Sequence, residues 1–322
     1  MKRPFRTVQR GLAISWLSLL IVAALLAPST VPTPDLATIN QPPFHSTHWL
    51  GTTSQGLDVG MSLWQGARTL LLVSVPAALC TLLLGGFLGG IAGYWGNTGL
   101  RITRTQLVLM VAGVGLAGLL LSWFPGAGGW PWLGVPAAAG LGLLPWRNKK
   151  PSTNTWPFPV DSSILALIAL VNSVPLLVLV VAVASIQRPS LAGVVALLSL
   201  TCWPTPARLM RAATLQSRSQ PYIEAAQAAG LPAVRILWRH ISPNALPVLL
   251  VRFPLTVAVL ISLETTLSFL GVGLPPETPS WGRLLAAVRQ APANWWLMLW
   301  PGLAIAFTIL SLQYIATSKE GE

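Results

Sequence analysis

Charged residues are scarce in this chain of 322 residues. Only 9% of the residues are Asp, Glu, Lys or Arg, whereas 53% are hydrophobic and the mean hydropathy is +0.65. Soluble domains usually carry about 25% charged residues, because charged side chains cover the water-facing surface. So few charges exclude an ordinary soluble domain and predict an all-α, polytopic membrane protein.

Acidic residues and cysteines are also few. The chain has 8 acidic residues against 20 basic ones, which gives a net charge of +12. The basic residues are scattered between apolar runs and form no dense patch with interleaved aromatics, so they indicate positive cytoplasmic loops rather than nucleic-acid binding. The two cysteines, Cys80 and Cys202, lie inside apolar runs and form no CxxC pair. This placement is typical of buried structural thiols.

Sequence motifs for ATP binding and for catalysis are missing. There is no GxxxxGK[ST] phosphate-binding loop, so any ATP would have to bind to another chain. There is no Ser-His-acid set and no pair of intramembrane carboxylates. His45 and His48 lie three residues apart without carboxylate or thiol neighbours, which makes a poor metal site. We therefore predict that this chain is not an enzyme and binds no cofactor or metal of its own.

Long uncharged runs are abundant instead. The first, Gly11–Ser29, follows several basic residues and resembles a signal peptide. It is longer than the roughly 7–15 apolar residues of a signal peptide, and no A-x-A cleavage site follows. We interpret residues 1–29 as a cytoplasmic tail and an uncleaved first transmembrane helix.

Further runs predict seven more transmembrane helices. A membrane helix needs about 20 apolar residues. After an outer segment at 30–68, single spans are predicted near residues 69–94, 162–187, 189–207, 246–272 and 295–315. Residues 105–146 are uncharged and long enough for a hairpin of two spans with its turn at Gly126–Gly129. The second half, Trp130–Trp146, is short and contains three prolines, so a re-entrant segment stays open as an alternative.

The distribution of charge orients these eight spans. With both termini in the cytoplasm, the inner segments hold most of the basic residues, and the outer segments hold only Arg68, Arg188, Arg283 and Arg289. This division obeys the positive-inside rule. Residues 69–322 then form the main membrane domain, and its longest cytoplasmic loop covers about 208–245.

The second half of this loop is predicted to form two short helices joined at a bend. Pro221 suits a first helical turn, and Glu224 lies near the positive end of the helix dipole. The alanines that follow are strong helix formers with very small side chains. Gly230 is a natural helix end, and Pro232 suits the start of a second helix that ends before Pro243.

In the second helix, an apolar stripe is predicted at helical spacing from Val234, Leu237, Trp238 and Ile241. Arg235 and Arg239 are predicted to share a wetter face. From the residues alone, this pair of helices fits either a docking element for another protein or an amphipathic segment on the lipid headgroups.

The stretch YIEAAQAAG…HISPN, within Tyr222–Asn244, resembles the EAA loop of ATP-binding-cassette importer permeases. The similarity is to the second permease subunit of dipeptide, oligopeptide and nickel importers. Three further stretches resemble the same family: Trp49–Val73, Val160–Val183 and Leu263–Leu285. The resemblance implies the type I importer fold, whose members have six transmembrane helices, so residues 105–146 look like an inserted hairpin.

Two smaller departures from the family pattern are visible. The family's G-T-D-x-x-G-R-D has Thr53 in place of its acid and Leu57 in place of its arginine, so an ion pair between these two positions is absent. The family's I-L-P-N has Ser242 in place of its leucine.

The resemblance also implies a mechanism and partners. The EAA loop is the coupling helix of such permeases, and it docks in a groove of a cytoplasmic ATPase. By position, the implied docking and flanking residues are Glu224, Ala225, Ala226, Gly230, Arg235, Arg239, His240 and Pro243. The implied partners are a second permease subunit, two ATP-binding subunits that hold ATP and Mg, and an external solute-binding protein, in the cytoplasmic (inner) membrane of a bacterium. The implied cargo is a peptide or a related small solute, with nickel as a further candidate.

Glu264 is the one carboxylate within a predicted span. An intramembrane charge is by default a functional candidate, while the family's frequent Glu at this position makes a structural role equally fitting. Two other function classes stay open. A self-contained secondary transporter would be expected to show ion-coupling groups and internal repeats, and a non-transporting membrane scaffold would keep the docking loop alone.

Overall fold

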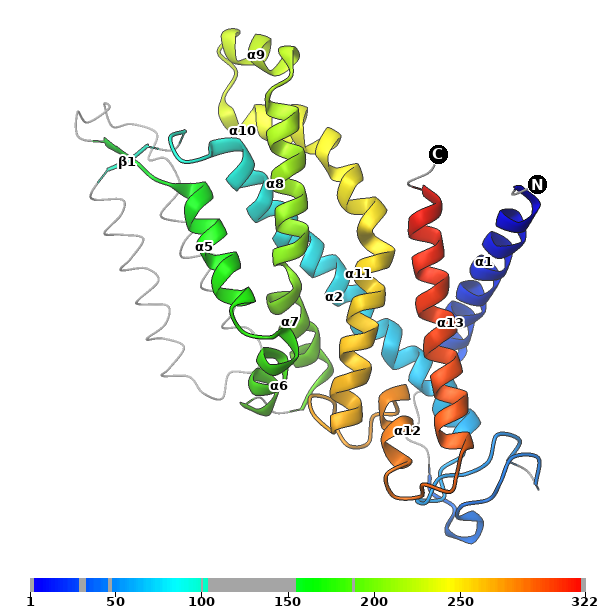
Figure 1. The fold of residues 1–322 in the computed structure, drawn as a ribbon. Coiled ribbons are helices and arrows are strands. Elements are labelled where there is room, and N and C mark those ends of the chain that lie inside the picture. The colour runs from blue at the N-terminus through cyan, green and yellow to red at the C-terminus, as the bar shows by residue number, and fades with distance from the viewer. Residues whose placement is uncertain are drawn as a thin grey trace.

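Helices make up most of the chain that the computed structural model describes, which is residues 3–28, 33–45, 48–99, 101–103, 155–186 and 189–319 (Figure 1). The predicted hairpin at 105–146 lies outside the described residues. The helices are α1 (Arg3–Leu26), α2 (Val59–Trp95), α5 (Val160–Asn172), α6 (Leu176–Ile186), α7 (Leu191–Cys202), α8 (Pro204–Arg218), α9 (Pro221–Ala228), α10 (Ala233–Ile236), α11 (Ser242–Leu270), α12 (Trp281–Ala287) and α13 (Trp296–Lys319). A short 3-10 helix covers Leu36–Thr38.

Four of these helical stretches are long and apolar enough to cross a membrane: Val8–Leu26, Val59–Trp95, Ala233–Leu270 and Trp296–Ser318. A fifth candidate is the pair α5 and α6, which is bent by 79°. The pair replaces the single helix predicted near 162–187. Pro175 lies in the break, and the steric restriction that a proline places on the residue before it favours a helix end there. The protein is thus a polytopic α-helical membrane protein.

Helix α2 begins at Val59, well before the start predicted near Thr69. The cause is Asp58, whose Oδ1 accepts a hydrogen bond of 2.8 Å from the backbone N–H of Met61. Such a side-chain cap satisfies one of the free N–H groups of the first helical turn. The first part of the predicted outer segment therefore remains a loop, and its last residues are helical.

Helices α2 and α8 lie against each other over a stripe of glycines on α2. A Cβ atom on Gly89 would lie 2.1 Å from the carbonyl oxygen of Ala207, and one on Gly85 would lie 2.7 Å from that of Trp203. A Cβ on Gly93 would meet the side chain of Thr214 at 2.7 Å. Small residues at a spacing of four allow helix backbones to approach closely in membranes. The two helices therefore pack through their backbones and form the centre of the molecule.

Two short strands hold together the ends of the segment 104–154. Strand β1 (Arg101–Thr103) pairs antiparallel with β2 (Thr155–Pro157), with Thr103 opposite Thr155. Beside them, Asp161 of α5 forms a bidentate ion pair with Arg211 of α8, with N–O distances of 2.5 and 2.6 Å. The chain therefore leaves α2 and returns to α5 at the same place.

The two ends of the helical body differ in what they carry. Figure 1 shows α9 at one end, the same end at which the chain's N- and C-termini lie. The loop 33–58 and α12 lie at the opposite end.

Candidate functional site

The bend predicted around Gly230 is present. Helix α9 starts at Pro221 and ends at Ala228, and Gly230 follows with φ of +75°. The N–H of Leu231 then donates to the carbonyl of Ala226 at 3.2 Å, and the N–H of Gly230 donates to that of Gln227 at 2.9 Å. These bonds satisfy the last carbonyls of the helix, and the left-handed conformation of residue 230 favours glycine.

Helix α9 is fixed to the protein by two buried apolar residues, Ile223 and Ala226. They pack in one cluster with Tyr94 at the end of α2. The cluster also includes Ile236, Leu237 and Ile241 of the helix that follows the bend, residues 233–241, here called the second arm. Ala226 was implied to be part of the docking core. Its side chain is largely buried, one helical turn from Ile223 on the anchoring side.

The opposite side of α9 is exposed and has very small side chains. Glu224, Ala225 and Gly230 all lie on it, together with Ala228 and Ala229. A Cβ atom built on Gly230 would meet nothing within 4 Å. A second protein could therefore approach the backbone of this helix closely, with one carboxylate, Glu224, near the positive end of the helix dipole.

The apolar stripe predicted on the second arm is only half buried. Leu237 and Ile241 are buried, whereas Val234 and Trp238 are 57% and 55% exposed. Trp238 stacks on Phe87 of α2, with ring centroids 6.4 Å apart. Among the implied flanking residues, Arg235 and Arg239 are exposed and His240 is half-buried.

The second arm was predicted to end before Pro243, but in the structure it continues past this residue. Helix α10 continues through a π-helical turn, Leu237–Ile241, directly into α11. Pro243 is exposed and lies in the first turn of α11. A proline lacks the N–H of a regular helical ladder, and the wider π turn just before it accommodates that loss. The second arm and the membrane-crossing part of α11 are therefore one continuous rod.

Two residues of this site were not singled out from the sequence. Tyr94 is buried under α9, and the guanidinium of Arg218 lies 6.0 Å from the centre of its ring. Asn244 donates from Nδ2 to the hydroxyl of Tyr222 and to the carbonyl of His240, both at 2.9 Å. Asn244 thus joins α9 to the rod. The aromatic pair Tyr94–Trp95 at the end of an apolar run was the available signal for the first of them.

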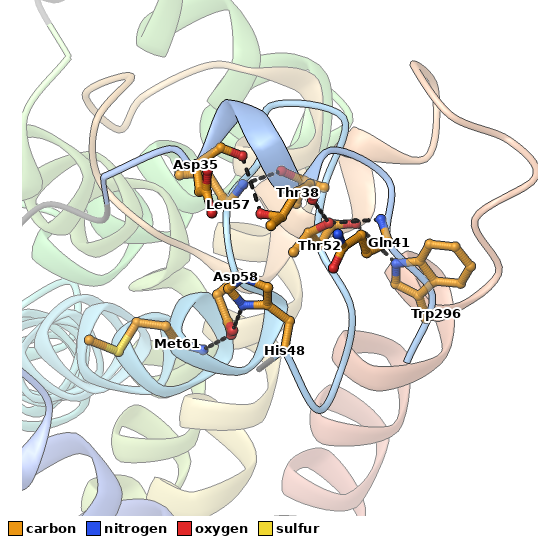
Figure 2. A network of polar contacts seen from close by, with 10 residues as sticks. Asp35, Thr38, Gln41, His48, Thr52, Leu57, Asp58, Met61 and Trp296 are labelled. Carbon is orange, nitrogen blue, oxygen red and sulfur yellow. Dashed lines mark hydrogen bonds and ion pairs between the residues drawn. The ribbon is translucent and has the colours of Figure 1, made fainter. Parts of the chain in front are cut away.

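The opposite end of the molecule is organised by hydrogen bonds (Figure 2). Thr52 is completely buried; its hydroxyl accepts the N–H of Gln41 at 2.9 Å and donates to the carbonyl of Thr38. The carbonyl of Thr52 accepts the indole N–H of Trp296 at 3.1 Å. This network joins the loop 33–58 to the start of α13.

Thr53, which replaces the acid of the G-T-D-x-x-G-R-D pattern, stabilises the turn that leads to Leu57. Thr53 is buried, and its hydroxyl accepts the N–H groups of Gln55 and Leu57 at 3.2 and 3.1 Å. A short polar side chain that bonds the backbone two residues on stabilises a tight turn. The Thr53 hydroxyl thus holds this turn without an ion pair.

His48 has a carboxylate partner after all. Its Nδ1 lies 2.6 Å from Oδ2 of Asp58, the residue that also caps α2. No group of three or more His, Cys, Asp or Glu side chains suited to a metal ion occurs in the described part of the chain. The pair connects the loop to the helix that follows it.

Glu264 lies in the middle of the helix packing. It is 1% exposed in α11, and its Oε1 accepts the hydroxyl of Ser268 at 2.7 Å, one turn further on. This placement is that of a carboxylate inside the helix bundle. Glu264 therefore lies far from the exposed surface of α9, near the other end of the rod.

The fold and the two ends define a helical membrane protein with an exposed, small-faced helix on one side and a hydrogen-bonded loop on the other. Residues 152–318 match the binding-protein-dependent transport system inner membrane component family, and the chain belongs to this family. This match contains α9, the rod and Glu264.

Individual relatives are permeases by name. A Brucella suis protein named for a peptide transport system permease is 36% identical over 161 residues, which are 50% of this chain and 54% of that protein. The chain thus spans about half the length of such relatives. The dipeptide transport system permease protein DppC of Bacillus subtilis is 25% identical over 297 residues, or 92% of this chain and 73% of that protein. The oligopeptide permease OppC of the same organism is 27% identical over 305 residues.

Proposed function

We propose that this chain is the transmembrane permease subunit of an ATP-binding-cassette importer for peptides or related small solutes in a bacterial cytoplasmic membrane. It works with a second permease subunit, two ATP-binding subunits and an external solute-binding protein. ATP and Mg bind to the partner ATPases, and α9 transmits their motion. Nickel is a second candidate cargo, which the implied family includes.

The observation that carries this proposal is the exposed small face of α9 on a rigid support. Glu224, Ala225 and Gly230 lie on the exposed side, while Ile223 and Ala226 hold the helix on the end of α2 and on the rod. A force on α9 is transmitted to α11 because the rod has no break between Ala233 and Leu270. Arg235, Arg239 and His240 flank this surface, and the two arginines supply positive charge to the partner contact.

For the topology, we propose eight spans with both termini cytoplasmic. Both termini lie at the end that carries α9 (Figure 1), in keeping with a cytoplasmic coupling helix. The pairing of β1 with β2 supports an insertion that starts and finishes on one side of the membrane, and therefore an even number of crossings between them. Residues 30–58 and α12 are then periplasmic.

The partner proposal is tested by affinity purification of the tagged chain from its native membrane in a mild detergent. We expect an ATPase and a second permease to co-purify, and the reconstituted complex to take up peptides only with ATP and the binding protein. Recovery of the chain alone at every detergent tested would contradict the proposal.

The topology is tested by a small tag placed within Gly126–Gly129. We expect an impermeant reagent to label this tag from the periplasmic side. A matched tag after Gly230 provides the control and should react only from the cytoplasmic side. Labelling of both tags from the cytoplasm would exclude the eight-span arrangement.

The alternative functions make opposite predictions in the same assay. A secondary transporter would continue to work without ATP and would stop when the ion gradient is removed. A scaffold would bind the ATPase without any peptide flux. Glu264 is assigned to the packing of the bundle in our proposal, because its carboxylate is bonded inside α11 rather than exposed.

A further inference from the structure

A cavity of about 300 Å³, open to the surface on one side, lies between the helices away from both ends. It is bounded by the break between α5 and α6, by the junction of α7 with α8, and by one side of α11. Irregular backbone is tolerated at membrane depth only where it is buried in protein or lines a cavity. The two broken passes therefore point to a space that the fold keeps open.

Arg252 of α11 lines this cavity. It lies in the continuous rod Ala233–Leu270, about 9 Å at 1.5 Å per residue from residue 246, where the predicted span begins. Its side chain is exposed. Within the described part of the chain, its guanidinium has no ion-pair or hydrogen-bond partner. A charged side chain inside a membrane span is costly and marks a path for ions or substrates.

The wall around Arg252 mixes polar groups with apolar ones. Asn172, Thr201, Thr205 and Thr256 also line the cavity. Thr256 is one turn from Arg252 and donates its hydroxyl to the Arg252 carbonyl at 3.2 Å. No Asp or Glu is among the lining residues. The cavity thus has one positive charge, several hydroxyl or amide groups, and no negative charge of its own.

We propose that this cavity is a transient binding site for a carboxylate of the transported solute, and that Arg252 is its binding residue. This inference rests on the proposed import function and adds the chemical class of the group recognised on the way through the membrane. A guanidinium presents a planar set of donors that matches a carboxylate in a bidentate pair. The polar residues nearby can form hydrogen bonds with the rest of a polar solute.

The first experiment measures the charge preference of the cavity without any transport. Thr256→Cys is placed in a chain whose native thiols are removed by Cys80→Ala and Cys202→Ala, and the complete complex is kept in membrane vesicles. The labelling rates of an anionic and a cationic methanethiosulfonate reagent are each divided by their rates with a free thiol. We expect the anionic reagent to be favoured about tenfold, equal to about 1.4 kcal/mol.

The matched variants are Arg252→Gln and Arg252→Lys in the same background. Arg252→Gln is expected to abolish the preference for the anionic reagent, and Arg252→Lys to retain it, because lysine keeps the charge. Equal rates for both reagents with Arg252 present, or no labelling by either, would overturn the proposal.

The second experiment measures uptake by the reconstituted complex. A tripeptide with a free C-terminal carboxylate is compared with its amidated form, and each rate is expressed relative to the wild-type complex, so that the selectivity of the binding protein cancels. We expect Arg252→Gln to slow uptake of the free peptide about tenfold and Arg252→Lys to restore most of it. Wild-type uptake of the free peptide by Arg252→Gln would overturn the proposal. A wild-type complex that moves no peptide, while the labelling preference persists, would contradict the import function and leave the anion site standing.

Discussion

The two ends of this molecule combine apolar packing and hydrogen bonds in different proportions. At the end that carries α9, an apolar cluster around Ile223 fixes a helix whose other side is exposed. At the opposite end, the loop 33–58 is held by hydrogen bonds around the buried Thr52 and contacts the start of α13. Beside the apolar cluster, the other side of α9 remains exposed to solvent, whereas Thr52 at the centre of the hydrogen-bond network is completely buried.

This difference suits the tasks that we propose for the two ends. Apolar contacts are non-directional and tolerate small displacements. A buried hydrogen-bond network specifies one geometry, since each unsatisfied partner costs free energy. Under the proposed function, apolar packing suits a helix that moves with its partner, and a hydrogen-bond network suits a loop that keeps one geometry on the outer side.

The largest effect is expected from Gly89→Ala in the α2–α8 contact that supports α9. The new methyl group would lie 2.1 Å from a backbone oxygen, and we expect a loss of about 3 kcal/mol in the free energy of unfolding, measured by thermal unfolding in detergent. Gly90→Ala is the matched control, because its methyl group would lie 3.7 Å from the nearest atom, the end of a methionine side chain. Equal stability of the two variants would contradict the close packing.

Thr52→Val tests the network at the other end. The change removes a donor and an acceptor from a completely buried position, which leaves the N–H of Gln41 and the carbonyl of Thr38 without this partner. We expect about 2 kcal/mol lower stability and no change in ATPase docking. Ser54→Ala, which loses one exposed bond to Gln290, serves as the control and should be nearly neutral. A reduced affinity for the ATPase would contradict the separation of the two ends.

Two changes at Gly230 separate backbone strain from surface contact. Because φ is +75° and no atom lies within 4 Å of a new Cβ, Gly230→Ala and Gly230→Trp should cost a similar amount of stability, about 1 kcal/mol. Only Gly230→Trp adds bulk to the exposed side of α9. We expect it to insert normally yet to uncouple ATP hydrolysis from uptake in proteoliposomes. Normal transport by the Trp variant would contradict a docking role for this surface.

The smallest effect is expected from Asn244→Ala. The change removes the bond from Asn244 to the hydroxyl of Tyr222, which joins α9 to the rod on the surface. We expect a loss of about 0.5 kcal/mol and faster hydrogen exchange in α9, with unchanged exchange in the loop 33–58. Unchanged exchange in α9 would show that the apolar cluster alone holds it.

Local sequence signals predicted much of the site around α9. Pro221 at the start, a run of alanines and the Gly230–Pro232 bend are all local features, and the structure has the helix and the bend where these residues indicated. The side of the helix that faces the protein was not predictable in the same way. It depends on Tyr94, which comes from a helix more than a hundred residues earlier. Ala226 is identical in kind to Ala225, yet one is buried and the other exposed.

The membrane part shows the same limit. Hydropathy predicted spans near 11–29, 69–94, 246–272 and 295–315, where the structure has helices long and apolar enough to cross a membrane, whereas the run 189–207 contains only a shorter apolar helix, Leu191–Cys202. It missed the bend of 79° in the run 162–187, although Asn172, Ser173 and Pro175 were local signals for it. It also placed the start of α2 too late, although Asp58 was a readable helix cap. The cavity around Arg252 depends on three passes meeting, and no single run of residues records it.

The pairing of β1 with β2 has a consequence for how such a chain can change over time. Thr103 and Thr155 are direct partners across the strand pair. Because their pairing brings residues 103 and 155 side by side, the joint itself needs no particular length of sequence between them. We therefore expect a designed two-residue turn to close the strand pair as a hairpin, and a folded reporter domain to be accepted at the same joint.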